Sequence, residues 1–160
     1  MKVFFGILAL LGFALSAAAH AYGLIGGSLH DNFAFVSTLH AGIFLVFIPA
    51  ILEVRKTSGK RDAFALLRGV PFGAIVLLAV LFVYAFLNFS SSFAGMPEGS
   101  PQLRDGQYVL MNKGHFIRTI TAEEYVQGQA AILRAFSGGW MLLYGLCAVI
   151  LLLRRRPSRS

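Results

Sequence analysis

Two histidines inside long apolar segments are the side chains of this sequence best suited to chemistry. His20 and His40 lie on consecutive segments, and counting inward at ~1.5 Å per residue places both about 7–10 Å below the same boundary. Paired imidazoles bind copper, zinc or haem iron, or relay a proton. Histidine is also easily kept neutral and hydrogen-bonded. We expect structural hydrogen bonding without a cofactor. The alternatives are a haem, copper or zinc site at this pair, or a role in proton transfer or quinone binding.

Other polar residues are weaker candidates. His30 and Asp31, in the loop after the first segment, would add ligands to a metal held by the two histidines. Arg134 lies near the outer end of the last segment, where a cation attracts an anionic head group or substrate. The sequence has no glycine-rich phosphate loop, no paired carboxylates within an apolar segment and no nucleophile beside a base. We therefore expect no catalytic residue.

Four apolar segments must position these residues. They cover residues 3–25, 33–54, 69–89 and 136–153, and each is long enough to cross a ~30 Å hydrocarbon core. Charged residues make up 13% of the chain, about half the fraction found in an average soluble domain. The sequence predicts a single all-α membrane domain with four transmembrane helices, arranged as two antiparallel hairpins.

A ridge of small residues on the first segment favours close packing. Gly12 and Ser16 precede His20 at intervals of four residues, so the three side chains share one face of a helix. Small residues let helix backbones approach each other in a membrane. We expect this ridge to turn His20 toward the neighbouring helices.

Positive charge is concentrated at one set of segment ends. Ten of the fourteen basic residues precede the first segment, separate the second from the third, or follow the fourth: Lys2, Arg55, Lys56, Lys60, Arg61, Arg68, Arg154, Arg155, Arg156 and Arg159. By the positive-inside rule, both termini lie in the cytoplasm, and we expect a bacterial inner (plasma) membrane. These clusters suit anionic lipid head groups, and their position argues against a nucleic-acid partner despite the net charge of +7.

The first segment also has the features of a secretory signal. Lys2 precedes it, and the small residues Ala19 and Ala21 flank His20 in the arrangement of a cleavage site. Cleavage there would leave three spans. The apolar run over 3–19 is longer than the ~7–15 residues of a signal core, so we expect residues 1–21 to be retained.

The connection between the third and fourth segments, residues 90–121, is predicted to form a small extracytoplasmic cap. Its first part, 90–103, is rich in Ser, Gly and Pro, which is typical of irregular coil. Two β-favouring runs follow, 107–111 and 115–120, on either side of Asn112-Lys113-Gly114. This pattern predicts a β-hairpin with a three-residue loop.

A long helix is predicted after the hairpin. Thr121 and Glu124 form a capping-box pattern that opens a helix over 122–154. At ~1.5 Å per residue this helix is ~50 Å long, so its first half stands outside the bilayer or lies on it. A two-stranded hairpin is only marginally stable alone and needs a support. The predicted interaction surface comprises Tyr108, Leu110, Phe116, Ile120, Tyr125 and Arg134.

Three classes of function remain open at this stage. The expected one is a non-catalytic integral membrane protein: an accessory subunit or a binding or assembly module that acts through its cap on another membrane protein or a second copy of itself. The second is a redox, haem- or metal-binding membrane protein that uses His20 and His40. The third is a small transporter or channel, formed by an oligomer because one four-helix bundle has little room for an aqueous path.

Overall fold

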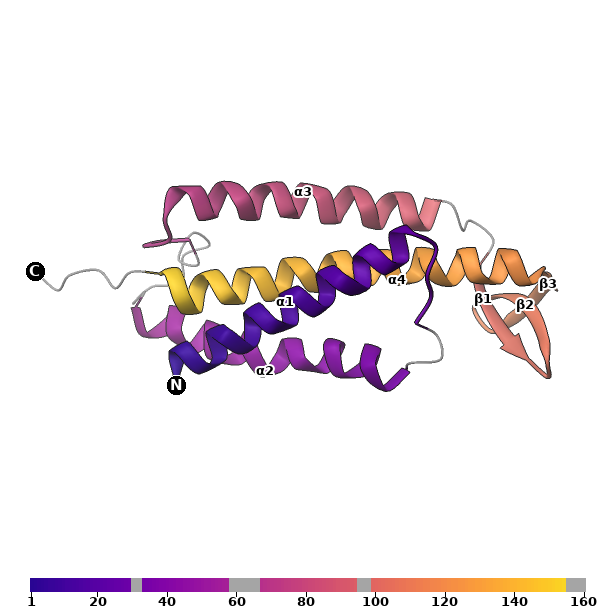
Figure 1. Ribbon diagram of the computed structural model, residues 1–160, viewed down its shortest axis with the longest axis horizontal. Helices are drawn as coiled ribbons and strands as arrows, with labels where there is room; N and C mark the ends of the chain where they lie inside the picture. Colours follow the sequence, from indigo (N-terminus) through magenta and orange to yellow (C-terminus); the bar gives the residue numbers. More distant parts are fainter. Residues whose placement is uncertain (30–32, 58–66, 95–98, 155–160) are drawn as a thin grey trace, which may run out of the picture.

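Four long helices and a small antiparallel sheet make up the computed structural model, which describes residues 1–29, 33–57, 67–94 and 99–154 (Figure 1). The helices are α1 (Lys2–Leu24), α2 (Phe33–Thr57), α3 (Phe72–Ala94) and α4 (Ala122–Ala148), and α4 continues into the π-helical segment η3 (Val149–Leu153). Each is long and apolar enough to cross a membrane, and α4 with η3 forms a 32-residue candidate span. The prediction of a mostly helical chain with four long apolar helices is confirmed.

The third helix differs from the predicted segment at both ends. α3 begins at Phe72, directly after Pro71. Proline is well suited to a helix start, because the N–H that it lacks would have no partner within the helix there. The helix runs on to Ala94, and the Ser91 hydroxyl donates to the Asn88 carbonyl at 3.0 Å within the added turn. The predicted coil over 90–103 is therefore wrong at its start, which is helical, and at its end, which is a strand.

All the other helices pack against α4, and its contact with α1 is the most extensive. A Cβ atom at Gly6 would overlap Leu152 of η3, and one at Gly23 would lie 2.9 Å from Cγ of Arg134. Such close approach is the reason for small residues at a helix interface. The predicted ridge is confirmed as part of the buried face of α1, whose members are Gly6, Ala9, Gly12, Ser16, Ala19, His20 and Gly23.

Tyr144 of α4 fills the space that glycines leave on two other helices. Its ring lies against Gly12 of α1 and its hydroxyl against Gly42 of α2, so a Cβ atom at either glycine would overlap it. The hydroxyl also donates to the carbonyl of Leu39 in α2 at 2.7 Å. Tyr144 is only 3% exposed. One side chain therefore connects α1, α2 and α4 at the centre of the core.

The start of α1 and the end of α4 with η3 lie at the same end of the bundle (Figure 1). Charged side chains meet there. Lys2 Nζ lies 3.5 Å from Oε1 of Glu53 in α2, and it donates to the Arg154 carbonyl at 3.3 Å. Arg154 Nε in turn donates to the Arg68 carbonyl at 2.9 Å. Glu53 and Arg154 are both buried. These contacts tie together the ends of α1, α2 and η3 and the segment that leads into α3.

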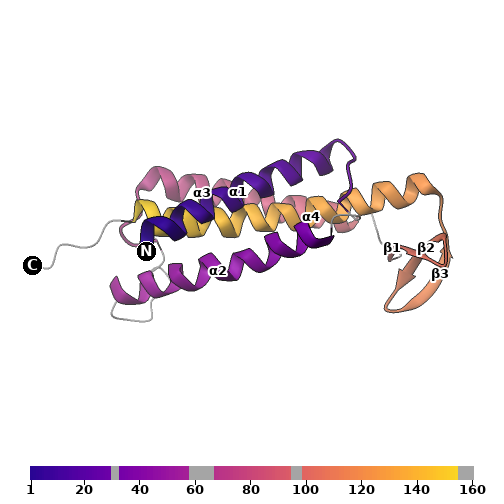
Figure 2. The ribbon, with the colours of Figure 1, turned by 60° about the horizontal axis from the view of Figure 1, so that its bottom comes forward.

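The outer sheet (100–119) lies beside the start of α4, beyond the opposite end of the bundle (Figure 2). Its strands are β1 (Ser100–Arg104), β2 (Gln107–Asn112) and β3 (His115–Thr119), all antiparallel in the order β1-β2-β3. The predicted hairpin corresponds to β2 and β3, and β1 was not predicted.

Two-residue turns connect the strands of the outer sheet. Asp105-Gly106 and Lys113-Gly114 all have positive φ, between 49° and 86°, as in the type I′ turns that match the twist of paired strands. Asn112 pairs with His115. The predicted three-residue loop is therefore one residue too long.

The outer sheet rests on the first turns of α4. The rings of Tyr108 in β2 and Tyr125 in α4 have their centroids 4.7 Å apart. Gln129 Nε2 donates to the Pro101 carbonyl of β1 at 2.9 Å, and a Cβ atom at Gly128 would lie 2.6 Å from the Pro101 ring. The helix thus supplies the support that an isolated hairpin lacks.

The fit around Tyr144 predicts the effect of adding a single methyl group. Gly12→Ala should push Tyr144 away from Leu39 and destabilise the fold by about 1–3 kcal/mol, the usual cost of overpacking. Gly139→Ala is the matched control, because a Cβ atom there meets nothing within 4 Å, and a helical Gly→Ala change gains up to about 1 kcal/mol. Thermal unfolding of both variants in one mild detergent measures the difference. Equal stability of the two would contradict this packing.

Candidate functional site

His20 is the centre of a buried polar network that joins three helices. Its Nδ1 lies 2.9 Å from Oγ of Ser137 in α4, and its Nε2 lies 2.5 Å from the Tyr84 hydroxyl of α3. Ser137 Oγ also lies 2.6 Å from the Leu133 carbonyl. Because a carbonyl only accepts, the Ser137 proton must point to the Leu133 carbonyl and is shared at most with the Arg134 carbonyl at 3.3 Å. His20 Nδ1–H then donates to Ser137, and Nε2 accepts the proton of Tyr84.

This arrangement satisfies a neutral imidazole completely. Both ring nitrogens of His20 have partners, and the ring is 4% exposed. A metal ion at Nε2 would have to displace the Tyr84 hydroxyl, because that nitrogen has one lone pair. The geometry therefore favours the structural role expected for His20 over ligation.

His40 lies in a different set of contacts. Its Nδ1 accepts a hydrogen bond from Nε1 of Trp140 at 3.2 Å, and its ring makes edge contacts with Phe44 and Trp140. The two histidines share none of the hydrogen-bond partners found in the described part of the chain. Within those residues no group of three or more His, Cys, Asp or Glu side chains could hold a metal ion. The predicted additions His30 and Asp31 lie outside the described residues.

A pocket lies beside Trp140, between residues 129–140 of α4, the start of α2 and the chain that follows α1. Leu29, Val36, Leu133 and Phe136 contribute to its largely apolar lining, and its volume is about 140 Å³. Sites for small organic ligands usually measure about 300–1,000 Å³. The volume of this pocket lies below that range.

The network includes residues that the sequence analysis missed. Tyr84 and Asn88 are spaced four residues apart on α3, so both face α4; Asn88 Nδ2 donates to the Arg134 carbonyl at 2.7 Å. Ser137 lies on α4, one turn from Arg134. The sequence does show these residues as polar positions inside apolar segments. It does not show that Tyr84 and Ser137 bond to His20, because that depends on how the helices pack.

The predicted interaction surface divides into internal and exposed residues. Leu110 and Tyr125 are buried where the outer sheet meets α4. Tyr108 and Ile120 are half-buried, and the Ile120 N–H donates to the Tyr108 carbonyl at 2.9 Å. Phe116 is 58% exposed. Packing between sheet and helix thus accounts for most of this surface and leaves Phe116 available for contact.

Strand β3 is the most accessible part of the outer sheet. All five of its residues are exposed, including the apolar pair Phe116 and Ile117. Ile117 has no paired residue in β2, where the register shifts by a β-bulge. In the described chain β3 pairs only with β2, so its other edge presents unpaired backbone groups.

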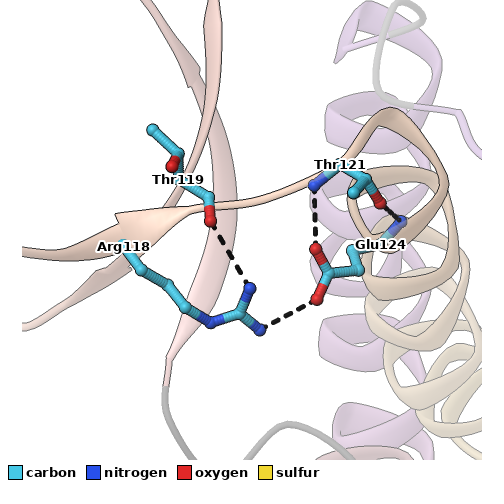
Figure 3. Close-up of polar contacts among 4 residues, drawn as sticks. All are labelled: Arg118, Thr119, Thr121 and Glu124. Atoms are coloured by element: carbon cyan, nitrogen blue, oxygen red, sulfur yellow. Dashed lines mark hydrogen bonds and ion pairs between the residues drawn. The ribbon is translucent and has the colours of Figure 1, made fainter.

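A charged cap fixes the junction between β3 and α4 (Figure 3). The Thr121 hydroxyl accepts from the Glu124 N–H at 3.1 Å, and Glu124 Oε2 accepts from the Thr121 N–H at 2.8 Å, which confirms the predicted capping box. Arg118 Nη2 lies 3.0 Å from Glu124 Oε1, and its Nη1 donates to the Thr119 carbonyl at 3.4 Å. The hydrogen bond from Arg118, with that from Thr121, holds the pKa of Glu124 below its usual value.

No family model, curated protein or solved structure matches this chain. The helices, the His20 network and the exposed strand are therefore the features from which a function can be inferred.

The His20 network predicts the cost of deleting one hydroxyl. Tyr84→Phe should leave His20 Nε2 without a donor and lower stability by about 1 kcal/mol, the typical value for a hydrogen bond between membrane helices. Tyr22→Phe is the control, since no hydrogen bond of the Tyr22 hydroxyl is found among the described residues. Detergent-resistance or thermal unfolding curves compare the two. A Tyr84→Phe protein as stable as the control would show that this bond contributes nothing.

The capping box predicts a local, pH-dependent loosening. Thr121→Ala should weaken the start of α4 by ~1 kcal/mol and speed proteolysis within 107–129, whereas Thr121→Ser keeps the hydroxyl and serves as the control. Because the folded pKa of Glu124 lies below its ordinary value of about 4.5, the carboxylate stabilises the cap fully above that pH. The contribution is lost as pH falls through the lower folded value. Cleavage rates that are independent of both the mutation and acidification would contradict this account.

Proposed function

We propose that this protein is a membrane-anchored docking module. Its four helices span a bacterial inner membrane as two antiparallel hairpins with both termini in the cytoplasm, and the outer sheet binds a partner protein on the other side. The observation that carries the proposal is β3, an edge strand with two large apolar side chains exposed at the far end of a membrane-length bundle.

The apolar exterior of the helices supports membrane insertion. α3 contributes the clearest case, because only 6% of its most apolar window is buried although the helix consists almost entirely of apolar residues. Such a surface would be an aggregation hazard in water and is what a lipid-facing helix presents. The basic residues around Lys2, Arg68 and Arg154 gather at the end that the positive-inside rule assigns to the cytoplasm.

The length of the last helix supports a position outside the bilayer for the sheet. The 32 residues of α4 and η3 measure about 48 Å, against ~30 Å for the hydrocarbon core. About twelve residues therefore extend beyond the core, and the Tyr125 and Gln129 contacts with the sheet lie on these turns.

A partner that pairs with β3 would satisfy two features at once. An added strand would bond the free edge and cover Phe116 and Ile117, as in recognition by β-strand addition. The role is non-catalytic, that of an accessory or assembly subunit. The partner is the extracytoplasmic part of another membrane protein or a second copy of this chain. The hypotheses of a redox centre and of an oligomeric transporter stay untested, and no contact in the described residues favours them.

Substitutions on β3 test the docking proposal. The double variant Phe116→Ser, Ile117→Ser should reduce recovery of a reproducible partner from native membranes at least tenfold, since two large apolar side chains contribute a few kcal/mol when buried. The control is His115→Ser, Thr119→Ser, which changes two exposed polar residues of the same strand. Photo-crosslinking followed by purification in mild detergent provides the measurement.

Two outcomes would count against docking. One is recovery of the same partner, in the same amount, with both double variants. The other is the absence of any reproducible crosslink from the wild-type protein, crosslinks between copies included. Folding of each variant is checked by its unfolding curve, because Phe116 and Ile117 are exposed and their loss should leave the bundle intact.

A further inference from the structure

Arg134 of α4 is a cation with no counter-charge bonded to it among the residues that the structure describes. Its Nε atom is buried and has no hydrogen-bond partner. No hydrogen bond or ion pair involves its side chain within residues 1–29, 33–57, 67–94 and 99–154. Because only Nε is both buried and unpartnered, the two terminal nitrogens reach the molecular surface. The guanidinium thus offers a fork of donors to whatever surrounds the helices.

The start of the Arg134 side chain lies against α1, and its backbone carbonyl is bonded to α3. Cγ of Arg134 lies against Gly23 of α1, where a Cβ atom would come within 2.9 Å of it. The Arg134 carbonyl accepts from Asn88 Nδ2 of α3 at 2.7 Å and from Ser137 Oγ at 3.3 Å. The hydrogen bond from α3 therefore fixes the backbone at Arg134, and the start of the side chain lies in the gap that Gly23 leaves. A side chain held at its start loses less freedom when its guanidinium binds a ligand.

The acidic residues in the described outer part of the chain are engaged elsewhere or distant in the fold. Glu123 accepts from Gln127 Nε2 at 3.1 Å, and Glu124 pairs with Arg118. Asp105 lies in the turn between β1 and β2. Facing Arg134 from α1 are His20, which is satisfied by Ser137 and Tyr84, and the carbonyl end of the helix. That end supplies only about half a negative charge, so the described residues do not fully neutralise the guanidinium.

The position of Arg134 along α4 indicates what it meets. Arg134 precedes Arg154 by twenty residues, which is about 30 Å of helix. Arg154 marks the inner end of the apolar span. A hydrocarbon core of ~30 Å therefore places Arg134 at the opposite boundary of the core, where its long side chain extends toward the lipid phosphates.

We propose that Arg134 binds a phosphate group at this boundary through its terminal nitrogens. Two parallel N–H···O bonds to phosphate oxygens match the geometry of the guanidinium fork and are charge-assisted. A phospholipid head group and free inorganic phosphate share this chemistry. The inference rests on the proposed membrane insertion, because the depth argument requires it.

The test compares the phospholipid retained by three full-length proteins. Wild type, Arg134→Gln and Arg104→Gln are reconstituted into vesicles of phosphatidylcholine and phosphatidylglycerol, extracted in mild detergent and examined by native mass spectrometry. Arg104→Gln is the matched control, since Arg104 is exposed on β1. Retention should fall about tenfold in Arg134→Gln and stay unchanged in the control. A second arm titrates lipid-free wild type with inorganic phosphate while the Arg134 Nε–H resonance is followed.

Each outcome decides the question. Retention that depends on Arg134 without a response to inorganic phosphate assigns the site to a lipid head group, and a phosphate response without retained lipid assigns it to the free anion. Equal retention in all three proteins, with no phosphate response, overturns the proposal. If Arg134→Gln fails to fold, Arg134→Lys keeps the charge but not the fork and should still retain severalfold less lipid.

Flotation of the same vesicles separates this inference from the proposed function. Wild-type protein that does not float with the vesicles contradicts membrane insertion itself. Protein that floats but shows no dependence on Arg134 contradicts only the phosphate site.

Discussion

The bundle depends on the fit of one large side chain into the gaps left by two glycines. Tyr144 lies between Gly12 and Gly42 and donates to Leu39. Lipid tails are as apolar as helix surfaces, so helices in a membrane associate through such close packing and hydrogen bonds rather than through the hydrophobic effect. With α1 and α2 fixed to α4 in this way, α1 presents His20 to Ser137 and Tyr84, and Gly23 leaves the gap that Arg134 occupies. The positions of His20 and Arg134 thus depend on the packing of α1 and α2 against α4 around Tyr144.

The same helix connects the bundle to the outer sheet. Through its core α4 carries small and aromatic residues that face α1, α2 and α3, and in its first turns it carries Tyr125 and Gln129, which face the sheet. The capping box at Thr121 sets the direction in which the chain enters α4 from β3. A helix with one end inside the bundle and the other under the sheet holds β3 at a fixed distance from the core, as the proposed docking role requires.

Local signals in the sequence were sufficient for the four helices and the start of α4. Long apolar runs, a capping box and the basic stop at Arg154 are all short-range patterns. β1 was missed because Ser, Gly and Pro around it suggested coil, although Asp105-Gly106 is a strong turn signal between strands. The partners of His20 could not be predicted, because Tyr84 and Ser137 are 64 and 117 residues away in sequence and meet only through helix packing. The predicted end of the third helix was likewise wrong. It was placed where polar residues begin, but Ser91 and Ser92 are part of α3.

The central claim is that the bundle crosses a membrane and holds the outer sheet on the side opposite the termini. Labelling of single cysteines with a membrane-impermeant maleimide, in a Cys147→Ala background, tests it directly. We predict that Val126→Cys is labelled in intact cells, that Val80→Cys on the exposed face of α3 is protected throughout, and that Lys56→Cys is labelled only after the membrane is permeabilised. Labelling of Lys56→Cys in intact cells with protection of Val126→Cys would contradict the orientation, and labelling of Val80→Cys would contradict insertion.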